Sequence, residues 1–345
     1  MDPFSQAVLG AAVAHGCCGR KLGWKAAAWG ALAGAAPDID ILFGIGGDEF
    51  DRLQSHRGIT HALIFAPVVG PIWGWLLDRR ERKRGAPADP TQLRAWIAAI
   101  TLALWSHPLL DYFTPYGTQL LLPFSDARFA SGAMPIIDPV YTGILGAALF
   151  LAWRLRAGRL AIWASWAGLA LSCTYIAWAW QLNEAAVDFA RADLAARGVH
   201  DAAIRAYPTV LQIHYRRVVA RTPTTDYAGF ISLWDPCPID WGNAPRRDDA
   251  FTRSLATTRE GRIFDWFAMG MATAFSELSS NGRSVRVIDL RYGTSNDPLQ
   301  SIFSLEAILD EAGNVLSATM RQFPDNAREV SLDGLFERAY AVCRG

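Results

Sequence analysis

Long apolar runs separated by short charged or Pro/Gly-rich loops dominate the first half of this 345-residue chain. A helix needs about 20 mostly apolar residues to cross a bilayer, and several of these runs approach that length. We therefore predict an α-helical integral membrane domain of five to six membrane segments over residues 1–182. The first run is too short to cross and is expected to be re-entrant or interfacial. The runs are Phe4–Ala14, Trp24–Ala36 resuming at Ile41–Ile45, Ala62–Leu77, Leu93–Trp105, Val140–Trp153 and Leu160–Leu182.

From residue 183 the chain has ordinary soluble composition, with β-branched and aromatic residues in short stretches that are typical of strands. Residues 183–345 are therefore expected to form an extramembrane α+β domain that covers the membrane site, selects a substrate or binds a partner. Helices are predicted at Glu184–Arg205 and Arg262–Leu278, and strands at Val210–Ala220, Tyr227–Trp234, Val285–Tyr292, Ser301–Leu309 and Val315–Gln322.

The distribution of charge predicts the orientation of the chain. Basic residues accumulate in the cytoplasmic loops of membrane proteins. We expect a multi-pass protein of the bacterial inner membrane, in contact with the lipid bilayer, with residues 183–345 outside the cytoplasm. The formal net charge of +0 argues against a nucleic-acid partner. One side of the predicted spans holds twelve basic residues, Arg20, Lys21, Lys25, Arg79, Arg80, Arg82, Lys83, Arg84, Arg94, Arg154, Arg156 and Arg159, and the other side holds three, Arg52, Arg57 and Arg128.

The five cysteines show no C-x-x-C pair and no regular spacing, so neither a zinc ribbon nor a disulfide framework is indicated. Cys237 and Cys343 both fall in the second half. They could pair if that half faces an oxidising compartment.

Histidine and aspartate recur at the edges of three consecutive apolar runs, and the predicted topology puts all of them at the same outer membrane level. Carboxylates at membrane depth are costly, so they are functional candidates. Imidazole with carboxylate, without thiolate, is the ligand set of a catalytic divalent ion, zinc or else manganese. The candidate metal ligands are Asp38, Asp40, His56, His61, His107 and Asp111.

The spacing of these residues allows a common centre. His107 and Asp111 are four apart, which on a helix places both side chains on one face about 6 Å apart. His56 and His61 are five apart, and a turn at Gly58 is expected to bring both back to one centre.

Six donors exceed the three that a catalytic zinc usually takes from protein. Either two ions bind, or some carboxylates orient histidines and act on water. Water bound to the ion would be the nucleophile, and a free aspartate would accept its proton. Asp38 and Asp111 are the candidates for this catalytic role.

A series of short motifs runs in order through most of the first 160 residues: Met1–Gly10, Gly19–Lys21, Pro37–Asp40, His56–His61, Ser106–Asp111, Tyr116–Gln119, Pro123–Asp126 and Ile137–Thr142. This series resembles the YdjM-type, DUF457-like family of inner-membrane proteins. The resemblance implies a membrane-bound, metal-dependent hydrolase, distantly similar to zinc-dependent phospholipase C enzymes. It also implies metal or catalytic roles for the six histidines and aspartates named above.

The chain departs from this family at one position, because many relatives carry a histidine in the first helix where this chain has Gln6. Gln6 could supply a weaker oxygen ligand, His15 could replace it from more than a turn away, or the ligand could be missing. Gln6 and His15 are about 13 Å apart along a helix, so both are not expected to bind one ion. Asp138, which precedes Pro139, predicts a helix start and is a further candidate beside the site.

Three functions remain open. The first is a metal-dependent hydrolase whose site opens at the outer leaflet and acts on an unidentified small molecule or lipid, such as a lipid-linked phosphate or ester. The second is a cation-coupled transport or ion-binding protein in which a broken helix carrying Asp38 and Asp40 holds the ion. The third is a structural or regulatory membrane protein in which the metal only stabilises the fold. No phosphate-binding Gly loop or serine triad motif is present in the sequence.

Overall fold

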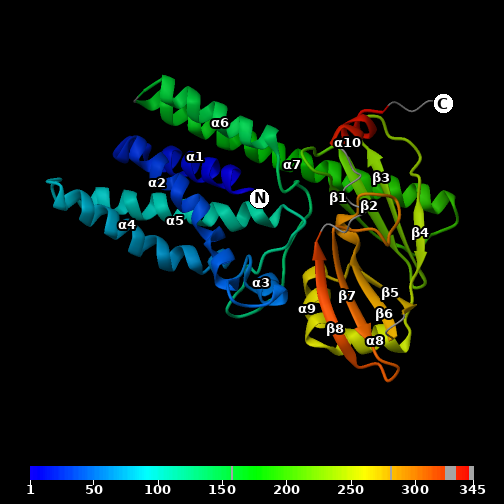
Figure 1. Ribbon diagram of the computed structural model, residues 1–345. Coiled ribbons are helices and arrows are strands. Elements are labelled where there is room, and N and C mark those ends of the chain that lie inside the picture. Colours follow the sequence, from blue (N-terminus) through cyan, green and yellow to red (C-terminus); the bar gives the residue numbers. More distant parts are fainter. Residues whose placement is uncertain (157, 280–281, 323–331, 342–345) are drawn as a thin grey trace. The chain divides into compact units, whose positions relative to one another are not determined.

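The computed structural model describes residues 1–156, 158–279, 282–322 and 332–341. The chain divides into two compact units, one of residues Met1–Ile45 and Ser55–Trp178, the other of residues Gly46–Gln54 and Ala179–Gly345. The first unit is helical and the second carries the two sheets (Figure 1). The predicted order of a helical membrane region followed by a β-rich α+β region is confirmed.

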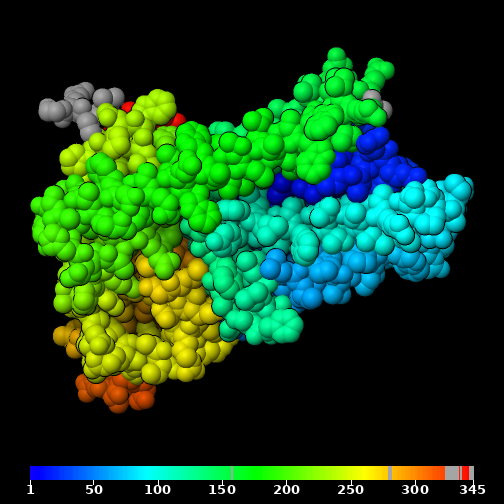
Figure 2. All heavy atoms as spheres, turned by 180° about the vertical axis from the view of Figure 1, so that it is seen from behind, coloured from blue at the N-terminus to red at the C-terminus, as the bar shows by residue number. Residues whose placement is uncertain are grey.

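In the helical unit, α1 packs against α2, α5 and α6, and α5 packs against α2 and α4 (Figure 1). Figure 2 shows the opposite face, where α6 and the first part of α7, in green, lie over the blue α1. The elements are α1 (Pro3–Leu22), α2 (Trp24–Ala35), η1 (Ala36–Gly44), η2 (Ile59–His61), α4 (Phe65–Lys83), α5 (Pro90–Tyr112), α6 (Pro139–Arg154) and α7 (Arg159–Ala196), of which residues 159–178 belong to this unit.

Small residues allow α1 and α2 to approach closely. A Cβ atom on Gly10 would lie 2.3 Å from the carbonyl oxygen of Gly30, and one on Gly34 would lie 2.5 Å from the carbonyl oxygen of Gln6. Between membrane helices, van der Waals packing of this kind replaces the hydrophobic driving force. The close contact fixes where Gln6 and the carbonyl group of Gly34 lie.

Fewer helices than predicted are suited to span a membrane. By length and composition, three described helical segments qualify, Trp24–Gly44, Pro90–Tyr112 and Arg159–Ala196, and a fourth is added if the pair Glu49–His61 and Phe65–Lys83, bent by 62°, counts as one span. The prediction of five to six membrane segments is thus confirmed for three to four candidate spans. The helix α6 has 16 residues, which is about 24 Å of helix against about 30 Å of hydrocarbon. The helix α1 contains buried Gln6 and His15 and ends in Arg20 and Lys21.

The second unit contains two four-stranded antiparallel sheets, each with its strands in sequence order. Val219 pairs with Ala228 in the first sheet, and Val287 pairs with Leu305 in the second. The strands are β1 (Ala203–Pro208), β2 (Tyr215–Arg221), β3 (Thr225–Ser232), β4 (Gly242–Pro245), β5 (Ala272–Ser279), β6 (Gly282–Asp289), β7 (Phe303–Leu309) and β8 (Val315–Gln322). The remaining elements are α3 (Glu49–Ser55), α8 (Ala250–Thr257), α9 (Arg259–Ala268), η3 (Leu290–Tyr292) and α10 (Leu332–Ala339).

Both predicted helices of this unit differ from the structure, and two strands differ in their ends: β2 begins at Tyr215 and not at Val210, and β6 ends at Asp289 and not at Tyr292. The stretch 262–278, predicted as one helix, ends its helix at Ala268 and continues as the strand β5, with Met269 in the left-handed conformation between them. The helix predicted to reach Arg205 ends at Ala196, and β1 follows. Cys237 is disulfide-bonded, and its predicted partner Cys343 lies outside the described residues.

Candidate metal centre

Three short elements carry the candidate ligands to one place in the helical unit. Asp38 and Asp40 lie in η1, His61 ends η2, and His107 and Asp111 lie in the last two turns of α5. In η1 the chain continues past Pro37 as a 3-10 helix, since proline is tolerated in a first helical turn.

The two aspartates of η1 contact opposite sides of one imidazole ring. Asp40 Oδ2 lies 3.1 Å from His61 Nδ1, and Asp38 Oδ1 lies 3.6 Å from His61 Nε2. His61 and Asp40 are fully buried, whereas the side chain of Asp38 is 15% exposed. The ring of His61 is therefore held from both sides in a buried place.

Asp38, His61 and His107 form a group that could hold a metal ion. The Nε2 atoms of His61 and His107 are 3.0 Å apart, and Asp38 Oδ1 lies 3.6 Å and 3.3 Å from them. Around a tetrahedral ion with bonds of about 2.0–2.1 Å, ligand atoms lie about 3.3–3.4 Å from one another. The three atoms are thus spaced as three ligands of such an ion would be.

The other ring nitrogen of each histidine is occupied. His107 Nδ1 lies 2.5 Å from the carbonyl oxygen of Gly34, an acceptor only, so Nδ1 carries the proton. His61 Nδ1 lies beside the Asp40 carboxylate, which likewise accepts. Both Nε2 atoms then present lone pairs to each other, and a cation or a shared proton between them removes the repulsion. A histidine tied through its second nitrogen to a carbonyl or carboxylate is the usual arrangement of a metal ligand.

Asp40 organises the loop that carries His61. Its carboxylate accepts hydrogen bonds from the backbone N–H of Arg57 at 2.8 Å and from the hydroxyl of Thr60 at 3.1 Å, and it lies 3.0 Å from His56 Nδ1. The left-handed residue of this loop is Arg57, with φ 58°, whereas a turn at Gly58 was expected. His56 therefore lies against Asp40, and the loop brings His61 to the other two ligands.

Asp111 lies beside the three ligand atoms. Its Oδ2 is 3.4 Å from His61 Nε2 and 3.6 Å from His107 Nε2, and 3.0 Å from Arg57 Nε. Its Oδ1 accepts from the side-chain amide of Gln6 at 3.0 Å and contacts the amino group of Met1. Asp111 is fully buried, so these cationic and polar neighbours offset the cost of its charge.

Two buried acceptor oxygens in this cluster have no hydrogen-bond donor among the described residues: Asp38 Oδ2 and Gln6 Oε1. A buried acceptor without a partner costs about 1–3 kcal/mol, and more when it is charged. A surplus of acceptors over donors favours a bound cation.

The structure places the other candidates differently. Gln6 joins the cluster through its hydrogen bond to Asp111. His15 lies further along α1, where it bonds to Ser165 and stacks on a tryptophan ring. Asp138 caps α6, as its position before a proline predicted, and its oxygens accept from the backbone of Tyr141 and the hydroxyl of Tyr175.

Two groups that hold the site in place were not predicted from the sequence. The carbonyl group of Gly34 orients His107, and the hydroxyl of Thr114 accepts from Arg57 Nη1 at 2.8 Å. The only available signal for Gly34 was the Ala/Gly-rich composition of Trp24–Ala36, which permits close helix packing. A backbone acceptor leaves no mark of its own in a sequence.

Comparison with protein-family models matches residues 1–184 to the family described as "YdjM inner membrane protein". The chain is 36% identical over 102 residues to "Inner membrane protein YbcI" of Escherichia coli K12, covering 29% of this chain and 54% of that protein. It is 34% identical over 112 residues to "Uncharacterized protein YfhP" of Bacillus subtilis 168, covering 31% of each. The chain thus spans about half or less of the length of these curated relatives. No solved structure matches the chain.

Proposed function

Because the chain belongs to the YdjM inner membrane protein family and its Asp38/His61/His107 group could hold a metal ion, we propose that it is an integral membrane hydrolase that activates water with a divalent ion, most simply zinc. The observation that carries the proposal is the convergence of two Nε2 atoms and one carboxylate oxygen. Three protein ligands with a fourth position left for water are the arrangement of catalytic zinc sites.

Different residues of the site have different roles in the proposed reaction. The ion, when bound, lowers the pKa of a bound water from 15.7 toward about 7. Asp111 Oδ2, which lies beside both imidazoles, would accept the proton that the water loses. Arg57 holds this carboxylate in place, and Asp40 holds His61.

The surroundings of the site favour a substrate that comes from the bilayer. In η1 the apolar side chains next to the aspartates point outward, with Ile39 55%, Ile41 60% and Phe43 59% exposed. A membrane can cover this surface, whereas water would penalise it. We therefore propose a lipid-linked phosphate or ester as the substrate class.

The proposed orientation places the centre and the second unit outside the cytoplasm. The excess of basic residues at the opposite helix ends supports it. The disulfide at Cys237 supports it as well, because such bonds persist in oxidising compartments. Labelling of a cysteine placed in an exposed strand, such as Leu316→Cys, by a membrane-impermeant reagent in intact cells tests this orientation.

Hydrolysis itself is tested with full-length protein in detergent, stripped of metal and reloaded with zinc or manganese, against short-chain phospholipids and lipid phosphates. We expect metal-dependent product release that His107→Gln abolishes while the thermal unfolding of the protein stays cooperative. His200→Gln, an exposed histidine of the second unit, is the matched control and keeps full activity. Uptake of a cation into proteoliposomes, without hydrolysis of any of these compounds, would contradict the proposal and favour transport.

A further inference from the structure

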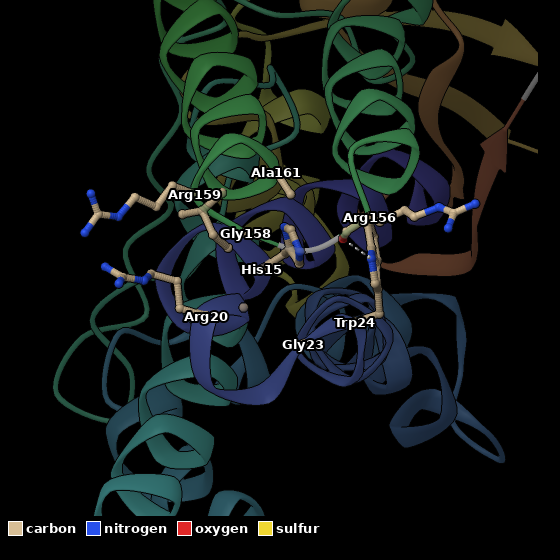
Figure 3. Close-up of a pocket in the computed structure, with 10 residues that line it drawn as sticks. His15, Arg20, Gly23, Trp24, Arg156, Gly158, Arg159 and Ala161 are labelled. Atoms are coloured by element: carbon tan, nitrogen blue, oxygen red, sulfur yellow. Dashed lines mark hydrogen bonds between the residues drawn. The ribbon is translucent and has the colours of Figure 1, made fainter.

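A second pocket lies in the helical unit, far from the metal centre. It has a volume of about 300 Å³ and is formed by the end of α1, the start of α2 and the loop that joins α6 to α7 (Figure 3). Gly19, one of its lining residues, is thirteen positions beyond Gln6 on α1, which is about 20 Å of helix. The pocket therefore cannot share a ligand with the metal centre.

The inner wall of the pocket is a histidine in a fixed position. His15 is 2% exposed, its Nδ1 lies 2.8 Å from the hydroxyl of Ser165, and its ring stacks on Trp24 at 4.5 Å. Trp24 in turn donates from Nε1 to the carbonyl oxygen of Arg156 at 3.3 Å, which ties the loop to α2 (Figure 3). Nε2 of His15 has no hydrogen-bond partner among the described residues. It lies toward Gly19, because a Cβ on Gly19 would come within 3.1 Å of it.

Three arginines line the pocket around this histidine. Figure 3 shows their side chains extending away from His15, Arg20 and Arg159 to one side and Arg156 to the other. All three are exposed, and none has an ion-pair partner in the part of the chain that the structure describes. By contrast, the nearby Lys21 and Lys25 are each paired with an acidic side chain. Positive charge is thus left uncompensated at this pocket.

The first turn of α7 adds to the positive electrostatic potential of the pocket. Arg159 and Ile162 belong to that turn and line the pocket, and the first N–H groups of a helix have no partner within the helix. A helix N-terminus also carries a partial positive charge that favours anions. Uncompensated guanidinium groups, the positive end of a helix and an unpaired imidazole nitrogen together match the oxygens of a phosphate group.

The outer surface beside the pocket is apolar. Leu160 is 69% and Trp163 is 68% exposed on the first turns of α7. Exposed tryptophan next to arginine at a helix end is typical of the membrane interface, where the ring sits at headgroup level. A phosphate held in the pocket can therefore belong to a molecule whose chains lie along α7.

We propose that this pocket binds a phosphate group carried by an anionic membrane lipid. On binding, the exposed arginines turn their guanidinium groups from the solvent toward the phosphate, His15 Nε2 faces it from the inner wall, and the acyl chains follow the apolar side of α7. Such a site anchors the helical unit in anionic lipid at the end opposite the metal centre, and it does not depend on hydrolysis.

The test is calorimetric titration of full-length protein in a neutral detergent with dioctanoyl phosphatidylglycerol, dioctanoyl phosphatidylcholine and inorganic phosphate. We expect saturable binding of phosphatidylglycerol only. Arg20→Gln, Arg156→Gln and Arg159→Gln should each weaken it about fivefold, the effect of one basic residue near an anionic surface. Arg154→Gln removes the same charge from the end of α6 without touching the pocket, and it should leave binding within twofold.

A second variant tests whether the space of the pocket, and not only its charge, is needed for binding. Gly19→Ala places a Cβ 2.8 Å from His15 Cδ2 and Ile162 Cδ1, so it should weaken binding as strongly as an arginine variant without altering the charge. Equal loss in Arg154→Gln would mean a diffuse surface charge and would overturn the proposal. Equal affinity for phosphatidylcholine would overturn it too. Binding of inorganic phosphate as tight as that of the lipid would assign the pocket to free phosphate and overturn the lipid assignment.

Discussion

Substitution of Asp40 tests whether this residue binds the metal itself or only holds the ligand His61 in place. Asp40 accepts hydrogen bonds from the backbone of Arg57 and the hydroxyl of Thr60, and its carboxylate lies against His61 Nδ1. Asp40 lies beside the group of Asp38, His61 and His107 but is not one of these three candidate ligands. Removal of such an orienting partner typically costs 10-fold to 100-fold in metal affinity.

Two substitutions should give graded results. In Asp40→Asn, the amide oxygen can still accept at the place of Oδ2, whereas the negative charge behind His61 and the acceptor that faces His56 are lost, and zinc affinity should fall about tenfold. In Asp40→Ala the acceptor disappears as well. Zinc affinity should then fall about 100-fold, and the buried N–H of Arg57 and the hydroxyl of Thr60 should each cost about 1–3 kcal/mol of unfolding free energy.

The assay is competition for zinc between the full-length protein and a chelator of known affinity, with thermal unfolding recorded on the same samples. Asp201→Asn, an exposed carboxylate in the second unit, is the control for the change of charge and should not alter zinc affinity. If Asp40→Asn loses zinc as completely as His107→Gln does, Asp40 is itself a ligand and the division of roles is wrong. Unchanged affinity in Asp40→Ala would also refute it.

Three further predictions concern the fold. Gly34→Ala places a Cβ 2.5 Å from a backbone oxygen of α1 and should cost about 1–3 kcal/mol or more of unfolding free energy, whereas Gly146→Ala, with open space around its Cβ position, should be neutral or stabilising in the same denaturation assay. Asp289→Asn leaves the buried guanidinium of Arg291 without its carboxylate and should lower the unfolding free energy by about 3–5 kcal/mol. Burial lowers the pKa of His214, so the unfolded chain takes up this proton first and stability should fall as the pH drops through about 6.5. His214→Gln should flatten that dependence in melting curves, and an unaltered slope would contradict it.

The sequence nominated six donors for the metal centre but could not divide the roles among them. Ligand chemistry leaves a local signature in the motifs around Asp38, His61 and His107, and the structure brings these three to ligand spacing. Whether Asp40 or Asp38 faces the common point depends on the turn of η1. Whether His56 or His61 does depends on the positive φ at Arg57. Both are properties of backbone geometry that spacing alone does not determine.

The fold, like the site, could be predicted from the sequence only where a local signal marks it. Caps and prolines predicted the start of α6 at Asp138, because a side-chain acceptor before a proline is a local signal. The stretch 262–278 mixes aromatic and small residues that fit a helix or a strand. The turn that divides it holds Met269 and Gly270, both with positive φ, but one glycine inside a helical pattern is a weak signal for a helix end.

The measurement that tests the metal centre most directly is zinc K-edge X-ray absorption of the zinc-loaded full-length protein, recorded for wild type and His107→Gln. The wild type should bind one zinc, with two imidazoles and oxygen ligands at about 2.0–2.1 Å and no sulfur at about 2.3 Å. His107→Gln should lose the zinc or show one imidazole fewer. A sulfur shell, or a spectrum unchanged by this substitution, would place the metal elsewhere and contradict the assignment of His61, His107 and Asp38.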